Sequence, residues 1–274
     1  MTGARAIKAL IFAAGSVGGL SGAAYGLLNG QSKRARSIIG MPRDLPLNAD
    51  GLYLPDGSGP YPPFRRDSVS FAVLGDSLAA GMGAELPEQL PGVRLARGLA
   101  DEFDRPVRLV THAISGSRTI DLEAQVDRAL IDPPELALVI IGGNDVTART
   151  SIGASASLLG RQVTRLIDAG ATVVVGTCPD LAIVVPIPQP LRTIASRYSL
   201  SLARAQRRVL DEISARAVSL AALLSPEFLA RPDELFSADR FHPNGKGYEF
   251  ATRVLLAPLC AAWRPGRVAS WSGT

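Results

Sequence analysis

A serine, a histidine and an aspartate occupy positions in this sequence from which they could act together on a carbonyl carbon. Ser77 follows an apolar run, within Gly75-Asp76-Ser77-Leu78, and His242 comes three residues after Asp239. A serine hydroxyl needs a base to take its proton, and that base needs a carboxylate to hold its tautomer. We therefore expect Ser77 to be a nucleophile, His242 its general base and Asp239 the residue that orients His242.

Each of these residues also has an ordinary structural use. A serine after a strand is a common helix N-cap, and a histidine before a proline often caps a helix that the proline begins. The chain holds two histidines, His112 and His242, and His112 is expected inside a strand as a core residue. The scarcity of histidine and the presence of Ser77 favour the catalytic interpretation of His242.

A serine nucleophile also needs donors for the negative charge that develops on the substrate oxygen. The candidates are the Ser77 backbone N–H, the Gly116 backbone N–H and the Asn144 side-chain amide. Gly116 could equally form a turn after a strand, and Asn144 with Asp145 could form a turn or a helix cap.

Short apolar runs alternate with helical patterns from Ser68 onward, which predicts a parallel sheet with helices on both faces. Ligands bind outside the carboxyl ends of the strands in such sheets, and Ser77, Gly116 and Asn144 all follow predicted strands. The predicted strands are 69–74, 106–114, 136–141, 172–175 and 218–224, and the predicted helices are 93–103, 120–131, 155–169, 192–217 and 247–262.

Four blocks of the sequence resemble those of the SGNH, or GDSL-type, hydrolases. They are Gly-Asp-Ser-Leu at 75–78, Gly116, Gly-x-Asn-Asp at 142–145 and Asp-x-x-His at 239–242, in the order and spacing of that family. The resemblance implies a three-layer αβα, flavodoxin-like fold with a five-stranded parallel sheet, and the hydrolysis of esters or thioesters. It also implies the roles given above, with Ser77, Gly116 and Asn144 forming the oxyanion hole, and it implies no metal or organic cofactor. The chain is most similar in character to exported actinobacterial esterases.

Composition limits the other classes of function. The net charge is +4, but residues 1–66 hold eight Lys or Arg and three Asp, so they carry +5 and the rest of the chain carries −1. No basic stripe lies outside the N-terminal part, so we expect no nucleic-acid partner. Two cysteines, Cys178 and Cys260, exclude a cysteine-based zinc site, and both are expected as free thiols.

The pattern of the N-terminal part predicts a hydrophobic segment followed by a connector. Residues 9–32 form an uncharged run of 24 residues with basic residues on both sides, long enough for a membrane-spanning helix. The run is expected to be an uncleaved anchor, with a cleaved signal peptide or a leader without membrane role as alternatives. Residues 41–66 contain six prolines and either hold the body off a surface or wrap around it. The expected division is 1–32 anchor or signal, 33–67 linker, 68–265 hydrolase domain and 266–274 tail.

These observations favour a serine esterase acting on short-acyl esters, located at the cell envelope through export or anchoring. The alternatives are a carbohydrate O-acetyl esterase, a lysophospholipase or thioesterase, and a catalytically silent binding module with the same fold. The expected partner is a small-molecule ester.

Overall fold

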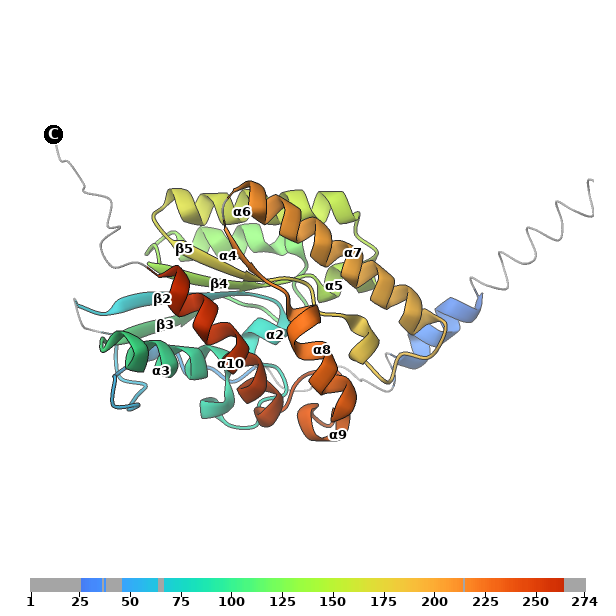
Figure 1. Ribbon diagram of the computed structural model, residues 1–274, viewed down its shortest axis with the longest axis horizontal. Helices are drawn as coiled ribbons and strands as arrows, with labels where there is room; N and C mark the ends of the chain where they lie inside the picture. Colours follow the sequence, from blue (N-terminus) through green and yellow to red (C-terminus); the bar gives the residue numbers. More distant parts are fainter. Residues whose placement is uncertain (1–25, 36, 38–45, 64–66, 214, 264–274) are drawn as a thin grey trace, which may run out of the picture.

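One twisted sheet lies at the centre of the molecule. The computed structural model describes residues 26–35, 37, 46–63, 67–213 and 215–263, and these form a six-stranded sheet of order β1-β3-β2-β4-β5-β6 (Figure 1). All neighbouring strands are parallel except β1, which pairs antiparallel with β3. The strands are β1 Gly51–Tyr53, β2 Val69–Gly75, β3 Val107–Thr111, β4 Leu136–Ile140, β5 Thr172–Gly176 and β6 Arg216–Val218.

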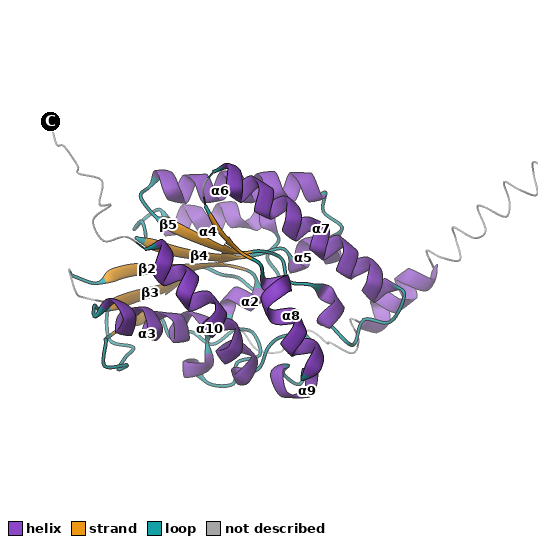
Figure 2. Cartoon of the chain, viewed as in Figure 1, coloured by secondary structure: helices purple, strands orange, loops and turns teal. Residues whose placement is uncertain are grey.

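Helices cover both faces of this sheet (Figure 2), which confirms the predicted αβα layers. The central strands are apolar on both sides: in β4, Leu138 packs into one core and Val139 into the other. Such double burial explains the strand's continuous apolar run. The long helices are α3 Pro91–Phe103, α8 Leu220–Ala230 and α10 Gly245–Ala262 on one side, α4 Leu122–Ala129 and α6 Ile152–Asp168 on the other, and α7 Leu191–Glu212, which contributes to both cores. Shorter helices are α2 Ser77–Ala80, α5 Gly143–Ala148 and α9 Pro232–Leu235, and 3₁₀ turns are η1 Pro87–Gln89, η2 Thr119–Asp121 and η3 Leu181–Ile183.

The sixth strand is a difference from the prediction of five parallel strands. β1 comes from the proline-rich connector, which therefore wraps the body. Its Tyr53 is completely buried, and the phenol donates a hydrogen bond to the Ala49 carbonyl at 2.5 Å. Three residues among prolines are too short to show an alternating pattern, which is why the sequence did not reveal this strand.

Three other predictions about the elements were wrong. The stretch 218–224 was expected as a strand, but the strand ends at Val218 and Leu220 begins α8. Ser219 caps that helix by accepting a hydrogen bond from the Ala222 N–H at 3.3 Å. A short apolar run fits a buried helix as well as a strand, and the serine cap decides here. The helix expected over 192–217 ends at Glu212. His112 was expected inside a strand as a core residue, but it lies one residue beyond β3 and is partly exposed.

The strand order places β2 between β3 and β4, at the point where the order of the parallel strands reverses. Ligands bind beside this point in open α/β sheets. Gly75, the last residue of β2, has φ +138°, and a Cβ there would lie 1.8 Å from the Ile140 carbonyl oxygen. Only glycine lets the two strand ends meet so closely, and Ser77 follows directly.

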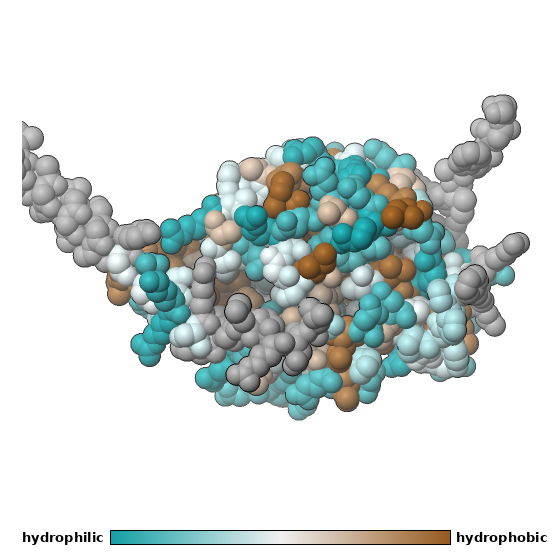
Figure 3. Space-filling model, turned by 180° about the vertical axis from the view of Figure 1, so that it is seen from behind, coloured by the Kyte–Doolittle hydropathy of each residue, from teal (hydrophilic) through white to brown (hydrophobic). Residues whose placement is uncertain are grey.

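Most of the hydrophobic segment 9–32 lies outside the described residues, but its last part does not. Residues 26–35 are helical and lie near the start of α7 (Figure 1). Among the helices that the structure describes, none combines the length and the apolar character needed to span a bilayer. On the face seen in Figure 3, hydrophobic and hydrophilic residues are interspersed. Both cysteines are free, as predicted, with Cys178 buried and Cys260 partly buried.

Candidate active site

The structure brings the three residues of the expected triad into contact. The Ser77 hydroxyl lies 2.9 Å from Nε2 of His242, and Nδ1 of that ring lies 2.6 Å from Oδ2 of Asp239. Ser77 and His242 are 8% and 6% exposed, so both are shielded from bulk water. Because a carboxylate only accepts, Nδ1 carries the proton, and Nε2 of the neutral ring is then free to accept the serine proton.

Ser77 is positioned by the turn between β2 and α2. Asp76 caps the short helix by accepting the Leu78 N–H at 3.0 Å, and this places Ser77 at the first helical position. Backbone N–H groups in a first helical turn have no acceptor within the helix. The turn therefore presents both the hydroxyl and the backbone N–H of Ser77 at the carboxyl edge of the sheet.

His242 is positioned by the turn that leads into α10. The Asn244 side chain caps that helix and also donates to the Phe236 carbonyl at 3.0 Å, which ties the two ends of the turn together. Oδ1 of Asp239 accepts hydrogen bonds from the Ser237 hydroxyl and from the Phe241 and His242 backbone N–H groups, all within 2.9 Å. The carboxylate is thus held by four donors, counting the ring.

These donors set the charge of Asp239. Burial raises the pKa of the Asp239 carboxyl, but hydrogen bonds from the His242 ring and from the His242 and Phe241 amides outweigh it and lower this pKa to about 2. Asp239 is therefore a stable anion at neutral pH, as a residue that orients and stabilises an imidazolium must be.

A second carboxylate, Asp76, lies beside the same ring with the opposite shift. Burial raises the pKa of the Asp76 carboxyl to about 6. The Leu78 N–H and His242 oppose this, and the neighbouring Asp145 carboxylate adds to it. Asp145 is fully buried, and its Oδ2 accepts the N–H and the hydroxyl of Thr119 at 2.9 and 3.0 Å.

The expected oxyanion donors are placed unequally. Asn144 lines the same cavity as Ser77 and His242, and its amide donates to the Ser117 carbonyl at 3.0 Å. An asparagine amide has two N–H donors, so this bond holds the group and leaves one N–H for a ligand. Gly116 has φ +85° and is exposed, and it is not among the residues that line the cavity.

A buried glutamine that the sequence analysis missed ties these parts together. Gln125 accepts the Gly75 N–H at 2.8 Å, and its amide donates to the Gly75 carbonyl and to the Ser117 hydroxyl. It therefore links the strand before the nucleophile to the residue that holds Asn144. A signal was present: Gln125 stands on the apolar side of its helix, at helical spacing from Leu122 and Ala129.

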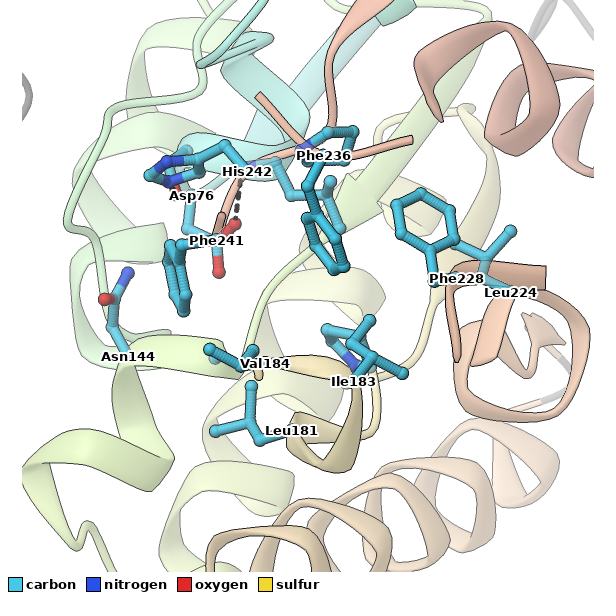
Figure 4. Close-up of a pocket in the computed structure, with 15 residues that line it drawn as sticks. Asp76, Asn144, Leu181, Ile183, Val184, Leu224, Phe228, Phe236, Phe241 and His242 are labelled. Carbon is cyan, nitrogen blue, oxygen red and sulfur yellow. Dashed lines mark hydrogen bonds between the residues drawn. The ribbon is translucent and has the colours of Figure 1, made fainter. Parts of the chain in front are cut away.

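The cavity at Ser77 is small and mainly apolar. Its volume is about 70 Å³. Figure 4 shows Phe228 and Leu224 at one end of it and Asn144 at the other, with Phe241 between them. The Phe241 ring meets the His242 ring edge to face, at 4.7 Å between centroids. In the part of the chain that the structure describes, no group of three His, Cys, Asp or Glu is arranged to hold a metal ion.

Comparisons with known proteins show the family to which the chain belongs. The model of the GDSL-like lipase/acylhydrolase family matches residues 73–250. The GDSL-like esterase Rv1075c of Mycobacterium tuberculosis is 43% identical over 241 residues, which cover 86% of this chain and 76% of that protein.

Solved structures share the fold at low identity. A crystal structure of TesA aligns with a TM-score of 0.57 at 21% identity, over 69% of this chain and 97% of that one. A lipase/acylhydrolase from Enterococcus faecalis gives 0.58 at 19%, over 72% and 98%. An acetyl xylan esterase variant from Geobacillus stearothermophilus gives 0.55 at 19%, over 70% and 95%. The chain thus belongs to the GDSL-like lipase/acylhydrolase family and is a carboxylic ester hydrolase.

Proposed function

We propose that this chain is a serine esterase that cleaves short-acyl esters through Ser77, His242 and Asp239. The observation that carries the proposal is the continuous pair of hydrogen bonds from the Ser77 hydroxyl through the His242 ring to Asp239, at 2.9 and 2.6 Å. A hydroxyl, a base and an orienting acid in this contact are what nucleophilic acyl transfer requires.

The proton path follows from the two ring nitrogens. Nε2 of His242 takes the Ser77 proton as Oγ attacks the carbonyl carbon, and the ring becomes an imidazolium that Asp239 stabilises. Nε2 then gives the proton to the leaving alcohol, and an acyl group remains on Ser77. A water molecule, deprotonated by the same nitrogen, attacks this acyl-enzyme; the bond between the acyl carbon and Oγ breaks, Nε2 returns the proton to Oγ, and the acid is released.

The negative oxygen of the tetrahedral intermediate needs fixed donors. We assign this role to the Ser77 N–H, in the first turn of α2, and to the second N–H of the Asn144 amide. Gly116 remains the third proposed donor. Its exposed position makes its contribution the smallest of the three.

The cavity supports the short acyl group. A volume of about 70 Å³ lies well below the range of 300–1,000 Å³ typical of ligand pockets, which favours a short acyl group over a fatty acyl chain. For this reason a lysophospholipase or thioesterase acting on long chains is less well supported.

The proposal is tested by p-nitrophenyl acetate hydrolysis with Ser77→Ala. We expect activity to fall to background, because no other described hydroxyl contacts His242. Ser151→Ala is the matched control, because Ser151 is exposed and its side chain makes no cap hydrogen bond. Wild-type turnover by Ser77→Ala would refute the assignment.

Removal of O-acetyl groups from carbohydrates is the second candidate, favoured by the small cavity at Ser77. Parallel assays with p-nitrophenyl acetate and acetylated xylo-oligosaccharides separate the two. A kcat/KM that is higher for the saccharides would establish the carbohydrate role.

We also propose that residues 9–32 export or anchor the enzyme at the cell envelope. The support is the uncharged run of 24 residues with basic flanks. Cell fractionation with an antibody to the body tests this, and recovery of the whole pool in the cytosol would contradict it.

A further inference from the structure

A second cavity, much larger than the one at Ser77, lies beside the start of α7. Its volume is about 480 Å³, within the range of 300–1,000 Å³ typical of ligand pockets. One wall comes from the helix over residues 26–35, through Leu28, Ser32 and Ala35, and the opposite wall includes Ala195 of α7. We call this cavity the helix-lined compartment.

The helix over residues 26–35 is fixed in this position by specific contacts. Oε1 of Gln31 accepts the Leu191 N–H at 3.1 Å, and the Gln31 amide donates to the Gln189 carbonyl. Ala35 is 5% exposed and belongs to the main hydrophobic core. The helix is thus docked on the first turn of α7, and the compartment between them is part of the fold.

The helix-lined compartment lies next to the active site and shares part of its lining. Leu181 and Phe241 line both cavities, and Phe241 contacts His242. The compartment also includes Val146 and Thr147, which come two and three residues after Asn144 in α5. In the cavity at Ser77, Asn144 lies at the end opposite Phe228 and Leu224 (Figure 4). A substrate bound at Ser77 therefore has a small apolar space on the side of Phe228 and the large compartment on the side of Asn144.

We propose that the helix-lined compartment binds the alcohol part of the ester, as an apolar alkyl chain. This proposal rests on the proposed function. If the short acyl group occupies the small space beside Phe228, the alcohol part of the ester must extend toward the helix-lined compartment. The chemistry of the lining agrees. Arg149 is its one charged side chain among the described residues, and it is exposed; most of the others are aliphatic or aromatic.

The inference also gives the N-terminal helix a role in substrate selection. Leu28 and Ser32 lie in the last part of the uncharged run 9–32, so part of the segment expected to export or anchor the enzyme also lines the compartment. The substrate class is an acetate or similarly short ester of a long-chain alcohol.

Hydrolysis of two ester series by the full-length enzyme tests this. The first series is alkyl acetates from ethyl to octyl, and the second is ethyl alkanoates from acetate to octanoate. We expect kcat/KM to rise about two- to fourfold per methylene along the alkyl acetates, as apolar groups enter the compartment. Along the ethyl alkanoates we expect it to fall beyond the shortest members.

Two variants fill the compartment from opposite walls, Ala195→Phe on α7 and Ser32→Phe on the N-terminal helix. Each is expected to abolish the rise along the alkyl acetates, so a folding failure of one leaves the other informative. Ala154→Phe is the matched control, on the exposed side of α6, and should keep the wild-type slope.

The outcomes separate the two proposals. Turnover of ethyl acetate with a flat alkyl acetate series, or a rise along the alkanoates instead, would overturn the compartment's assignment and leave the esterase intact. Retention of the slope in both filled variants would overturn it too. Absence of turnover for every ester would refute the proposed function itself.

Discussion

Two loops at the carboxyl edge of the sheet each place an aspartate beside His242, and the pKa values of the two carboxyls are shifted in opposite directions; Asp76 is buried and Asp239 is partly buried. Asp239, in the turn before α10, accepts four hydrogen bonds, and its pKa is lowered to about 2. Asp76, in the turn after β2, has the Leu78 N–H at 3.0 Å and a second carboxylate, Asp145, nearby, and its pKa is raised to about 6.

The difference shows that burial and hydrogen-bond donors together decide which acid serves the histidine, because Asp76 is the more deeply buried and Asp239 has the more donors. Burial raises the pKa of both carboxyls, yet only Asp239 has enough donors to overcome it. Asp239 is therefore suited to hold the ring as a permanent anion, whereas Asp76 is suited to cap α2 and position Ser77.

The largest expected effect comes from removing the charge of Asp239. Asp239→Asn should lower kcat for p-nitrophenyl acetate by about 10³–10⁴-fold, because the amide can hold the ring in the wrong tautomer and cannot stabilise the imidazolium. Asp76→Asn keeps an oxygen for the Leu78 N–H and should cost far less. Equal losses in the two variants would break the distinction between the two acids.

The second prediction concerns stability between pH 4 and pH 6. Because the pKa of Asp76 is raised in the folded state, that state binds more protons than the unfolded chain in this window, and stability falls as pH rises through it. A rise of this pKa from its ordinary value of 3.8 to about 6 corresponds to a loss of about 3 kcal/mol in the free energy of unfolding. Urea denaturation at several pH values should show Asp76→Asn without this decline. A decline of unchanged size would contradict the assignment.

Asn144→Ala should lower kcat by about 10²-fold with little change in KM, because the amide acts on the charge that develops in the transition state. The loss of the bond to the Ser117 carbonyl is a separate, structural effect. Asn144→Asp keeps the size of the side chain but offers no N–H donor, so it should be at least as slow. A change confined to KM would argue against an oxyanion role.

The smallest effect is the acid limb of the stability profile. The lowered pKa of Asp239 means that the unfolded chain binds more protons, so the stability this residue contributes is present above about pH 4 and is lost as pH falls toward 2. The contribution is about 2 kcal/mol. The acid limb measured by denaturation should become shallower in Asp239→Asn, and an unchanged limb would show that the donors around this carboxylate do not favour its anion.

Much of the fold and of the candidate site could be predicted from the sequence, because the candidate catalytic residues stand just after the apolar runs that form strands. Ser77 and Asn144 each follow an apolar run, and parallel strands deliver their carboxyl ends to one edge. Asp239 and His242 are three residues apart, so a tight turn is enough to bring them together. The turn is present, and it places Oδ2 of Asp239 2.6 Å from Nδ1 of His242.

What escaped prediction depends on long-range contacts. β1 is three residues long and exists because β3 offers an open edge. Gln125 has no motif around it, and its importance comes from Gly75 and Ser117, which the fold places against it. The helix-lined compartment likewise is lined by residues near position 30 and residues near position 195, and no local sequence pattern predicts that these segments lie together.

The central claim is that the Ser77 hydroxyl, activated by His242, is the nucleophile. The most direct test is reaction of the full-length enzyme with a fluorophosphonate probe, followed by mass spectrometry of the labelled peptide. We predict one adduct, on Ser77, that disappears in Ser77→Ala and forms far more slowly in His242→Ala. An adduct on another residue, or labelling of Ser77→Ala at the wild-type rate, would contradict this account.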